Sequence, residues 1–360
     1  MSRKLTSVAL LALLLATHLP ASQSETTTAA KRLVLIKTIG GKISPKSVTA
    51  SGDGLVSAHN MMYRHSVTLY DATSGDLVAT VPDTVQLSDF GFKGYSGSYK
   101  GAPVEGAFSP DGKYLYFTNY AMYGKGFLKE GHDTCSPASG YDTSFLSRIN
   151  VATKKIDAVF PVGSVPKVVK VTPDNKYILV TNWCSYTVTV ISIESGKTVK
   201  SVKIGRYPRG IAISSDSKFA YVAEMGGSSI HKISMADFSQ TLIPVGSNPR
   251  AVVISPDQNR LYVTMNSAGK VLAWDLATNK AIKSVATGKA ARSLAISEDG
   301  SALFVVNFES GTLSKVRTSD MTVLENIKVC KEAIGVTFDN STERTWVACY
   351  GGAIRVFANQ

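Results

Sequence analysis

The sequence predicts an all-β fold in which seven four-stranded sheets, or blades, close into a ring. Three observations carry this prediction: a strand-favouring composition, a motif that returns every 41 or 42 residues over most of the chain, and an extra strand before the first repeat. Of the 360 residues, 44% are hydrophobic and only 18% are charged, which suits a large buried core and excludes a disordered chain. Valine, isoleucine, threonine and aromatic residues occur in short runs separated by many of the 29 glycines and 13 prolines, as in short strands joined by tight turns.

Residues 1–23 are predicted to be a signal peptide. Arg3 and Lys4 precede the apolar run 8–16, and Pro20 and small residues follow it, which is the layout of a secretory signal. The run is shorter than the roughly 20 residues that a membrane-spanning helix needs. No cysteine follows directly, so a lipoprotein anchor is unsupported. We therefore expect a periplasmic or secreted protein with no membrane span.

Residues 24–31 are predicted to be a flexible leader, because this part of the chain is polar and lacks a hydrophobic face. The propeller itself is expected over residues 32–360. Loss of Arg3 and Lys4 with the signal peptide changes the formal net charge from +12 to +10, that is 37 basic minus 27 acidic residues. The mature protein is thus expected to be basic.

A motif with glycine first and proline or alanine fourth begins successive units of the chain. Five unit starts are in register, with spacings of 42, 41, 42 and 42 residues, at Gly163, Gly205, Gly246, Gly288 and Cys330. Weaker copies begin at Gly40 and Lys100, where insertions of 18 and 21 residues account for the longer spacings. The chain therefore contains seven units.

Each unit contains the pattern of four strands. Each unit begins with an apolar strand, followed by a turn such as 109–112 and a second strand such as 114–119. This pattern predicts a β-hairpin. A third strand such as 187–191, a polar turn and a fourth strand such as 198–202 follow. Four strands in about 42 residues are typical of one propeller blade.

The last unit begins at Cys330 and ends at Gln360, which leaves it about one strand short. The run 32–39 precedes the first unit and has the character of a fourth strand without partners of its own. We predict that this N-terminal strand completes the seventh blade, which closes the ring and leaves no open sheet edge.

Tyr-Val-Thr or a close variant stands near the end of each second strand, and Gly-x-x-Pro-Arg/Lys begins several units. In these motifs, residues 32–360 resemble the YVTN-repeat β-propellers, a group with WD40-like repeats. Three segments, 119–124, 136–141 and 181–185, are similar more narrowly to a YncE-like secreted branch of that group. The resemblance implies an exported, seven-bladed binding module, and it supplies no shared catalytic residue.

The sequence departs from the family pattern at the asparagine that ends the second-strand motif. Glu224, Met265 and Cys349 replace this asparagine in three blades, and His59 is expected to occupy its position in the first blade. The motif is therefore interpreted as a structural signature rather than a functional one.

Basic residues are predicted to converge at one mouth of the central channel. The first strand of each blade lines such a channel, and the residue after the proline or alanine of each unit start falls at its mouth. Around the ring these positions are Lys46, Val104, Lys167, Arg209, Arg250, Arg292 and Ile334. In one interpretation the charges are solvated or pair with neighbouring carboxylates. In the other, five cations aimed at one axis bind an anion, and Glu105 and Glu224 neutralise part of the charge.

Two insertions, near 83–99 and 120–143, are expected on the face that carries this mouth, and long loops on a rigid scaffold often carry function. Tyr120, Tyr123 and Trp183 are the aromatic residues assigned to the site. Aromatic and basic residues together suit single-stranded nucleic acid or an acidic polysaccharide. Packing of the loops onto the blades is the alternative explanation for any single ring. A protein partner on this loop-bearing face is a further expectation.

Four cysteines allow three disulfide connectivities. Cys135 lies in the longer insertion and Cys184 ends a second strand in the adjacent blade, while Cys330 and Cys349 occupy the glycine and asparagine positions of one blade. Export and this blade geometry favour Cys135 with Cys184 and Cys330 with Cys349. Metal ligation lacks a CxxC motif or a nearby histidine.

Motifs for catalysis are scarce. No CxxCH, HExxH, GxSxG or phosphate-binding glycine loop is present, and we predict no catalytic residue, metal or cofactor. The alternative function is a hydrolase or lyase, lactonase-like, that uses His59, His132 and Glu224 in the same cavity. The main prediction is a binding module with a basic, aromatic-rimmed channel mouth for an anionic ligand.

Overall fold

The computed structural model describes residues 32–61 and 64–360. The predicted signal peptide and leader lie outside the described residues. Within the described ranges, no helix has the length and apolarity that a membrane crossing requires.

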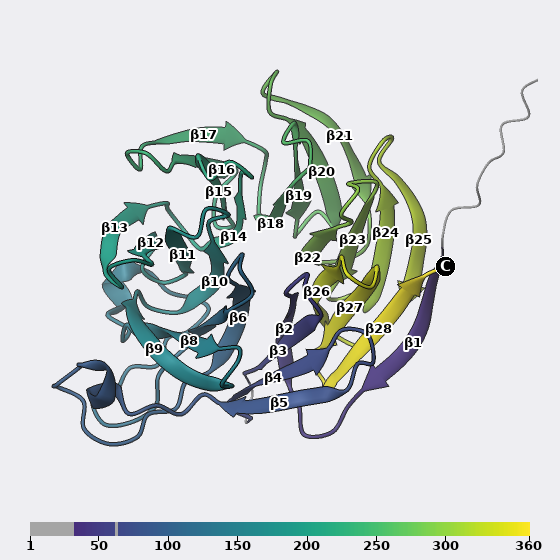
Figure 1. The fold of residues 1–360 in the computed structure, drawn as a ribbon. Helices are drawn as coiled ribbons and strands as arrows, with labels where there is room; N and C mark the ends of the chain where they lie inside the picture. Colours follow the sequence, from purple (N-terminus) through teal and green to yellow (C-terminus); the bar gives the residue numbers. More distant parts are fainter. Residues whose placement is uncertain (1–31, 62–63) are drawn as a thin grey trace, which may run out of the picture. The chain divides into compact units, whose positions relative to one another are not determined.

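The described residues form seven four-stranded antiparallel blades that follow one another in chain order (Figure 1). Blade one consists of β2 (Pro45–Ala50), β3 (Leu55–Asn60), β4 (Ser66–Asp71) and β5 (Leu77–Pro82). Blade two consists of β6 (Pro103–Phe108), β7 (Tyr114–Asn119), β8 (Ser144–Asn150) and β9 (Lys155–Val162). Blade three consists of β10 (Pro166–Val171), β11 (Tyr177–Asn182), β12 (Thr187–Ser192) and β13 (Thr198–Lys203). Blade four consists of β14 (Pro208–Ile213), β15 (Phe219–Glu224), β16 (Ser229–Ser234) and β17 (Gln240–Pro244).

The remaining blades repeat the same order of strands. Blade five consists of β18 (Pro249–Ile254), β19 (Arg260–Met265), β20 (Lys270–Asp275) and β21 (Lys280–Ala286). Blade six consists of β22 (Ala291–Ile296), β23 (Ala302–Asn307), β24 (Thr312–Arg317) and β25 (Thr322–Lys328). Blade seven consists of β26 (Ala333–Asp339), β27 (Arg344–Cys349), β28 (Ala353–Asn359) and β1 (Leu33–Ile39). The predicted seven-bladed propeller is thus confirmed.

The N-terminal strand closes the ring. β1 pairs antiparallel with β28, from Leu33 opposite Asn359 to Ile39 opposite Ile354, as the purple and yellow strands of Figure 1 show. The first strands of neighbouring blades contact one another all the way round, and β26 of blade seven contacts β2 of blade one. β28 therefore has a partner strand on both sides, and β1 completes blade seven, which confirms the predicted closure of the ring.

The core lies between the blades rather than within a single centre. The fully buried Trp346 of blade seven packs against Tyr70 of blade one, with ring centroids 6.3 Å apart. Burial of a large apolar side chain contributes about 1.5–3 kcal/mol. Inner strands such as β23 are buried throughout, whereas the outermost strand β21 is exposed along most of its length.

The asparagine of the second-strand motif has a structural role. The side-chain oxygen of Asn182 accepts a hydrogen bond from the backbone N–H of Gly163 at 3.0 Å, and its nitrogen donates to Thr189 at 2.8 Å. This pair of bonds ties the start of a blade to the end of its second strand. Cys330 and Cys349 occupy the same two positions in blade seven, where a disulfide replaces the hydrogen bond.

The expectation for blade one was wrong by one residue. Asn60, and not His59, lies opposite Pro45, and its side-chain oxygen accepts from the backbone N–H of Ser44 at 3.1 Å. Because successive strand residues point to opposite faces, this shift places the His59 side chain on the other face of the blade.

Candidate anion-binding site

The first strands of all seven blades line one axial cavity of about 490 Å³. Arg209, Arg250 and Arg292 line it near the beginnings of their strands, and Ile254 and Phe338 line it near the ends of theirs. A cavity of this size accommodates a small ligand or one end of a larger one.

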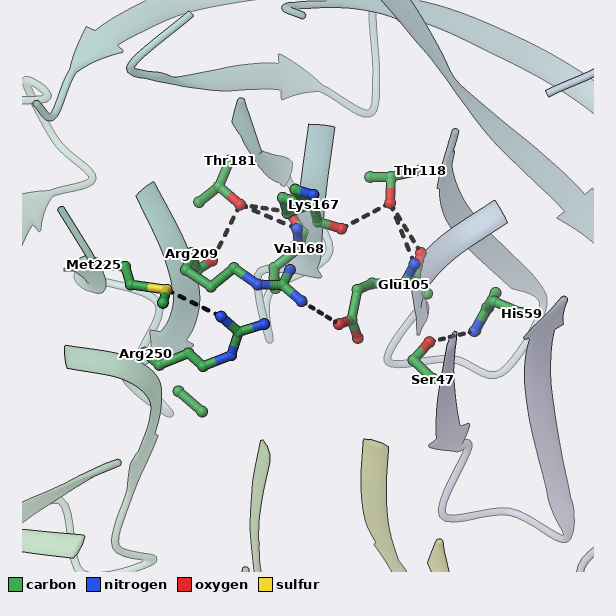
Figure 2. Close-up of polar contacts among 12 residues, drawn as sticks. Ser47, His59, Glu105, Thr118, Lys167, Val168, Thr181, Arg209, Met225 and Arg250 are labelled. Atoms are coloured by element: carbon green, nitrogen blue, oxygen red, sulfur yellow. Dashed lines mark hydrogen bonds and ion pairs between the residues drawn. The ribbon is translucent and has the colours of Figure 1, made fainter. Parts of the chain in front are cut away.

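A break in strand pairing positions the basic side chains. The register of β10 with β11 shifts between Pro166 and Val169, so the residue after the proline is released from the regular ladder. Thr181, the threonine of the repeat motif, accepts from the backbone N–H of Val168 and donates to the carbonyl of Arg209 in the next blade at 3.0 Å (Figure 2). Thr118 donates in the same way to the carbonyl of Lys167 at 2.7 Å. The motif threonines therefore hold the backbone under two of the cations.

The basic side chains are buried rather than solvated. Lys167, Arg209 and Arg250 each keep only 6% of their surface exposed, and Arg292 and Lys46 are half-buried. Val104 and Ile334 fill the two apolar positions of the ring and are also buried. Lys167, Arg209 and Arg250 are therefore not ordinary solvated residues, whereas the pairing with carboxylates that the same interpretation allowed is found for two of the five cations.

Carboxylates pair with two of the five cations among the described residues. The Lys167 ammonium lies 3.0 Å from the Asp133 carboxylate. A guanidinium nitrogen of Arg209 lies 3.1 Å from Glu105, as Figure 2 shows. Glu105 thus neutralises part of the charge, as expected. Glu224 does not: it accepts from the backbone N–H of Arg206 and lies 3.4 Å from the His231 ring, which places it in the asparagine role of its blade.

Two arginine donors around the cavity have no acceptor among the described residues, and a third has only a sulfur atom. Nη1 of Arg209 and Nε of Arg292 are buried without a hydrogen-bond partner, and Nη1 of Arg250 reaches the sulfur of Met225 at 3.0 Å. A buried donor without a partner destabilises the folded protein by about 1–3 kcal/mol, and more when the group is charged. The Arg292 guanidinium lies over the ring of Phe308, 4.4 Å from its centroid, which offsets only part of this cost.

The charged groups at the mouth have pKa values that are shifted from their usual values. Desolvation lowers the pKa of Lys167 to about 7, although Asp133 opposes the shift. Desolvation and the nearby cations lower the pKa of Lys46 and of Arg250 well below their usual values, and that of Arg292 to about 10. Although burial raises the pKa of Asp133, Lys167 and the other cations outweigh it and bring it to about 2. Such shifts in a cavity are typical of functional sites.

The structure adds two residues to this site that the sequence analysis did not assign to it. Asp133 belongs to the longer insertion, and nothing in its local sequence indicates that it meets Lys167. Lys170 stands three residues after Lys167 on β10 and lines the same cavity. Its side chain faces the cavity. Desolvation by the surrounding protein lowers the pKa of Lys170, and the charge of Glu105 opposes that shift. Its position on a channel-lining strand was the available signal.

The three assigned aromatic residues divide between two places. Tyr120 and Trp183 flank Lys167, with ring centroids 4.3 Å and 5.2 Å from its nitrogen. Tyr123 instead donates a hydrogen bond to Glu130 at 2.6 Å and has no contact with the five cations among the described residues. Five other rings of the insertions pack with Phe145 of β8 as a small second core; they are Phe90, Phe92, Tyr95, Tyr99 and Phe127.

The described residues contain both predicted disulfides, Cys135–Cys184 and Cys330–Cys349. The first pins the longer insertion to blade three. Beside it, the indole N–H of Trp183 donates to the carbonyl of Asp133 at 2.9 Å. The disulfide and this bond together hold the Asp133 carboxylate over the mouth.

The residues of the alternative enzymatic function each have separate partners. His59 is fully buried and bonded to Ser47 at 2.8 Å, and desolvation lowers its pKa to about 3 (Figure 2). Glu224 contacts His231 on β16, and His132 is exposed on the insertion. Within the described ranges, no contact joins any two of the three, and no cluster of potential metal ligands is present.

Comparisons with known proteins agree with this architecture. The model of the family described as "YNCE-like beta-propeller" matches residues 138–218. "Antigen Lp49" of Leptospira interrogans is 28% identical over 153 residues, which are 40% of this chain and 33% of that protein. The chain thus matches a third of the length of this curated relative. A chain of "Kuenenia stuttgartiensis Hydrazine Synthase" superimposes with a TM-score of 0.67 at 17% identity, covering 88% of this chain and 96% of that one, which shows the shared fold alone.

Proposed function

We propose that this YncE-like β-propeller is an exported binding protein whose channel mouth holds an anionic ligand. Buried arginine donors without acceptors around a shared cavity are the observation that carries the proposal. The two disulfides of the described residues support export, because disulfides persist in oxidising compartments.

The charge balance of the mouth supports an anion as the missing partner. Within the described part of the chain, the five cations of the ring and Lys170 of the same cavity face two carboxylates, Glu105 and Asp133, which leaves a formal excess of four positive charges. Like charges held together in a desolvated site raise the free energy of the unliganded protein. A bound oxyanion accepts from the unpartnered guanidinium donors, and each such charge-assisted hydrogen bond contributes about 1.5–3 kcal/mol.

Single-stranded nucleic acid and acidic polysaccharide are the two probes that fit this chemistry. Both carry oxyanions beside rings, planar bases in one and puckered sugars in the other, whose faces can pack on aromatic side chains, and Tyr120 and Trp183 lie next to the cation cluster. Stacking on such rings contributes about 1–3 kcal/mol per base. We therefore propose the binding of a ligand that presents an anionic group together with a planar or ring-shaped body.

The test compares two double substitutions that remove equal charge. Arg250→Met with Arg292→Met changes the mouth and keeps most of the side-chain volume. Lys176→Met with Lys218→Met changes the opposite face, where both lysines are more than two-thirds exposed and pair only with nearby aspartates. Binding of an oligothymidylate and of polygalacturonate is measured by calorimetry between about 50 and 200 mM salt.

The mouth variant is expected to bind at least about 100-fold more weakly at low salt and with a flatter salt dependence, because two charge-assisted contacts are lost. The far-face variant is expected to change affinity less than about 3-fold, since exposed charges act weakly. Equal losses of affinity in the two variants would mean that the binding is a general attraction of anions to a basic protein. That result would contradict a binding site at the channel mouth.

A further inference from the structure

Part of the cation ring is already neutralised from within the protein. Lys167 is paired with Asp133 at 3.0 Å and Arg209 with Glu105 at 3.1 Å. Both pairs lie toward the side of the ring that carries blades three and four. A ligand gains little from either cation unless it displaces the carboxylate that is already there.

The other three cations have no carboxylate partner within residues 32–61 and 64–360. Arg250, Arg292 and Lys46 stand on blades five, six and one, and only the apolar Ile334 of blade seven separates Arg292 from Lys46 around the ring. Desolvation lowers the pKa of Lys46 and of Arg250, and repulsion from Arg292 lowers each further. We call these three residues the unpaired arc.

The unpaired arc lies at one end of the axial cavity. Arg250 is only 6% exposed, and Arg250 and Arg292 both line this cavity, while the half-buried Lys46 directly precedes the cavity-lining Ser47. A polymer that lies across the face of the propeller keeps its internal charges outside this recess. A compact group at the end of a ligand enters it, and an arginine fork matches the geometry of a phosphate or a carboxylate.

We propose that the unpaired arc is a subsite for one terminal oxyanion, a phosphate or a carboxylate, which the ligand inserts end-on into the cavity. The proposal rests on the proposed function and narrows it to a ligand with an anionic end group. Asp133 is then the residue that directs the oxyanion to the arc. Its carboxylate remains 72% exposed while it covers the buried Lys167, and the Cys135–Cys184 disulfide holds it in place.

The first experiment measures the binding of inorganic phosphate, glucuronate and neutral glucose by calorimetry. Phosphate or glucuronate is expected to bind with one site per chain, and glucose is expected not to bind. Arg292→Met and Lys46→Met, tested separately, are expected to weaken oxyanion binding at least about 10-fold each, because each removes a charge-assisted contact. The melting temperature of each variant shows that it remains folded.

The matched control removes a neutral pair instead of a single charge. Lys167→Met combined with Asp133→Asn leaves the net charge unchanged and is expected to alter affinity less than about 3-fold. Asp133→Asn alone removes a negative charge that repels the ligand from the mouth and is expected to tighten binding about 3- to 10-fold. Tighter binding by this variant would mean that the Asp133 carboxylate competes with the ligand. A carboxylate that only supports the loop would not have this effect when replaced.

The outcomes divide the two proposals. Equal weakening by the neutral-pair variant and the arc variants would overturn the subsite and leave the whole mouth as the anion site. Binding that requires a polymer and grows with its length, without competition by phosphate or glucuronate, would also overturn end-on recognition while leaving the proposed function standing. A protein that binds neither the small oxyanions nor the polyanions would contradict both proposals.

Discussion

Two arginines of the mouth should respond oppositely to the same substitution. Arg250 is 6% exposed, has a sulfur atom as its nearest polar partner, and is repelled by Arg292 and Arg209. Arg250→Met keeps an apolar side chain of similar length and removes an uncompensated buried charge. We expect the free energy of unfolding to rise by about 1–3 kcal/mol in buffer without multivalent anions, within the range for replacing buried charges by packed apolar groups.

Arg209→Met should destabilise the protein instead. It leaves Glu105, whose side chain is 26% exposed, without its cation. A fully buried partner left unpaired costs about 3–5 kcal/mol, and the partial exposure of Glu105 reduces the expected loss to about 1–3 kcal/mol. The two variants remove the same charge and nearly the same atoms, so the difference in sign isolates the effect of pairing.

The assay is urea unfolding at low salt with the disulfides intact, because guanidinium chloride would screen the charges under study. Thermal melting is the second measurement, and 1 kcal/mol corresponds to about 2 °C or slightly less for a domain of this size. Added phosphate should stabilise the unsubstituted protein by mass action and have a weaker effect on Arg250→Met. If Arg250→Met is as destabilising as Arg209→Met, the guanidinium of Arg250 is satisfied in the folded protein and the reasoning from excess charge is wrong.

Three further outcomes are expected. Deletion of 32–39 exposes the edge of blade seven and should abolish cooperative melting, measured by circular dichroism; an unchanged transition would contradict closure by β1. The pKa of Lys167 is about 7 in the folded protein and about 10.4 in the unfolded chain. The unfolded chain therefore binds more protons between these two pH values. As a result this group makes the free energy of unfolding rise with pH from about 7 to 10, by at most about 1.4 kcal/mol per pH unit. Lys167→Met should remove that rise in urea titrations, and a slope that persists would place its origin elsewhere. Replacement of Cys330 and Cys349 by alanine opens a loop of 19 residues and should lower the free energy of unfolding by about 3 kcal/mol. Cys330→Gly with Cys349→Asn should recover about 1 kcal/mol of this loss, because the pair can form the hydrogen bond of the other blades. Equal stability of the two variants would argue against that bond.

Periodicity made the architecture predictable from the chain alone. Unit starts such as Gly163 and Gly205 recur at a constant spacing, and each unit folds into the same four strands because its apolar residues alternate in the same order. The last unit lacked one strand and the run 32–39 was one strand without partners, so pairing the two gave every blade four strands. The Cys330–Cys349 disulfide followed as well, because these two positions meet in every blade, whereas Cys135 was placed only by the face that carries its insertion.

Register in the first blade was not predictable to the residue. His59 and Asn60 are adjacent, and either could end the strand in a sequence pattern. The structure selects Asn60 because its amide bonds to the backbone of Ser44, while His59 is enclosed between blades, where only the neutral ring is favourable.

The sequence by itself determined that five cations converge on one axis, because the repeat places the residue after each proline at the same height of the channel. Only the tertiary structure decided that these cations are buried and that two of them are paired. The partner of Arg209 is Glu105, 104 residues away in blade two, and that of Lys167 is Asp133, which an insertion without a repeat pattern carries over the mouth. Periodicity specifies what each blade repeats, whereas charge pairing depends on side chains that meet across the ring, and burial depends on the blades that close around them.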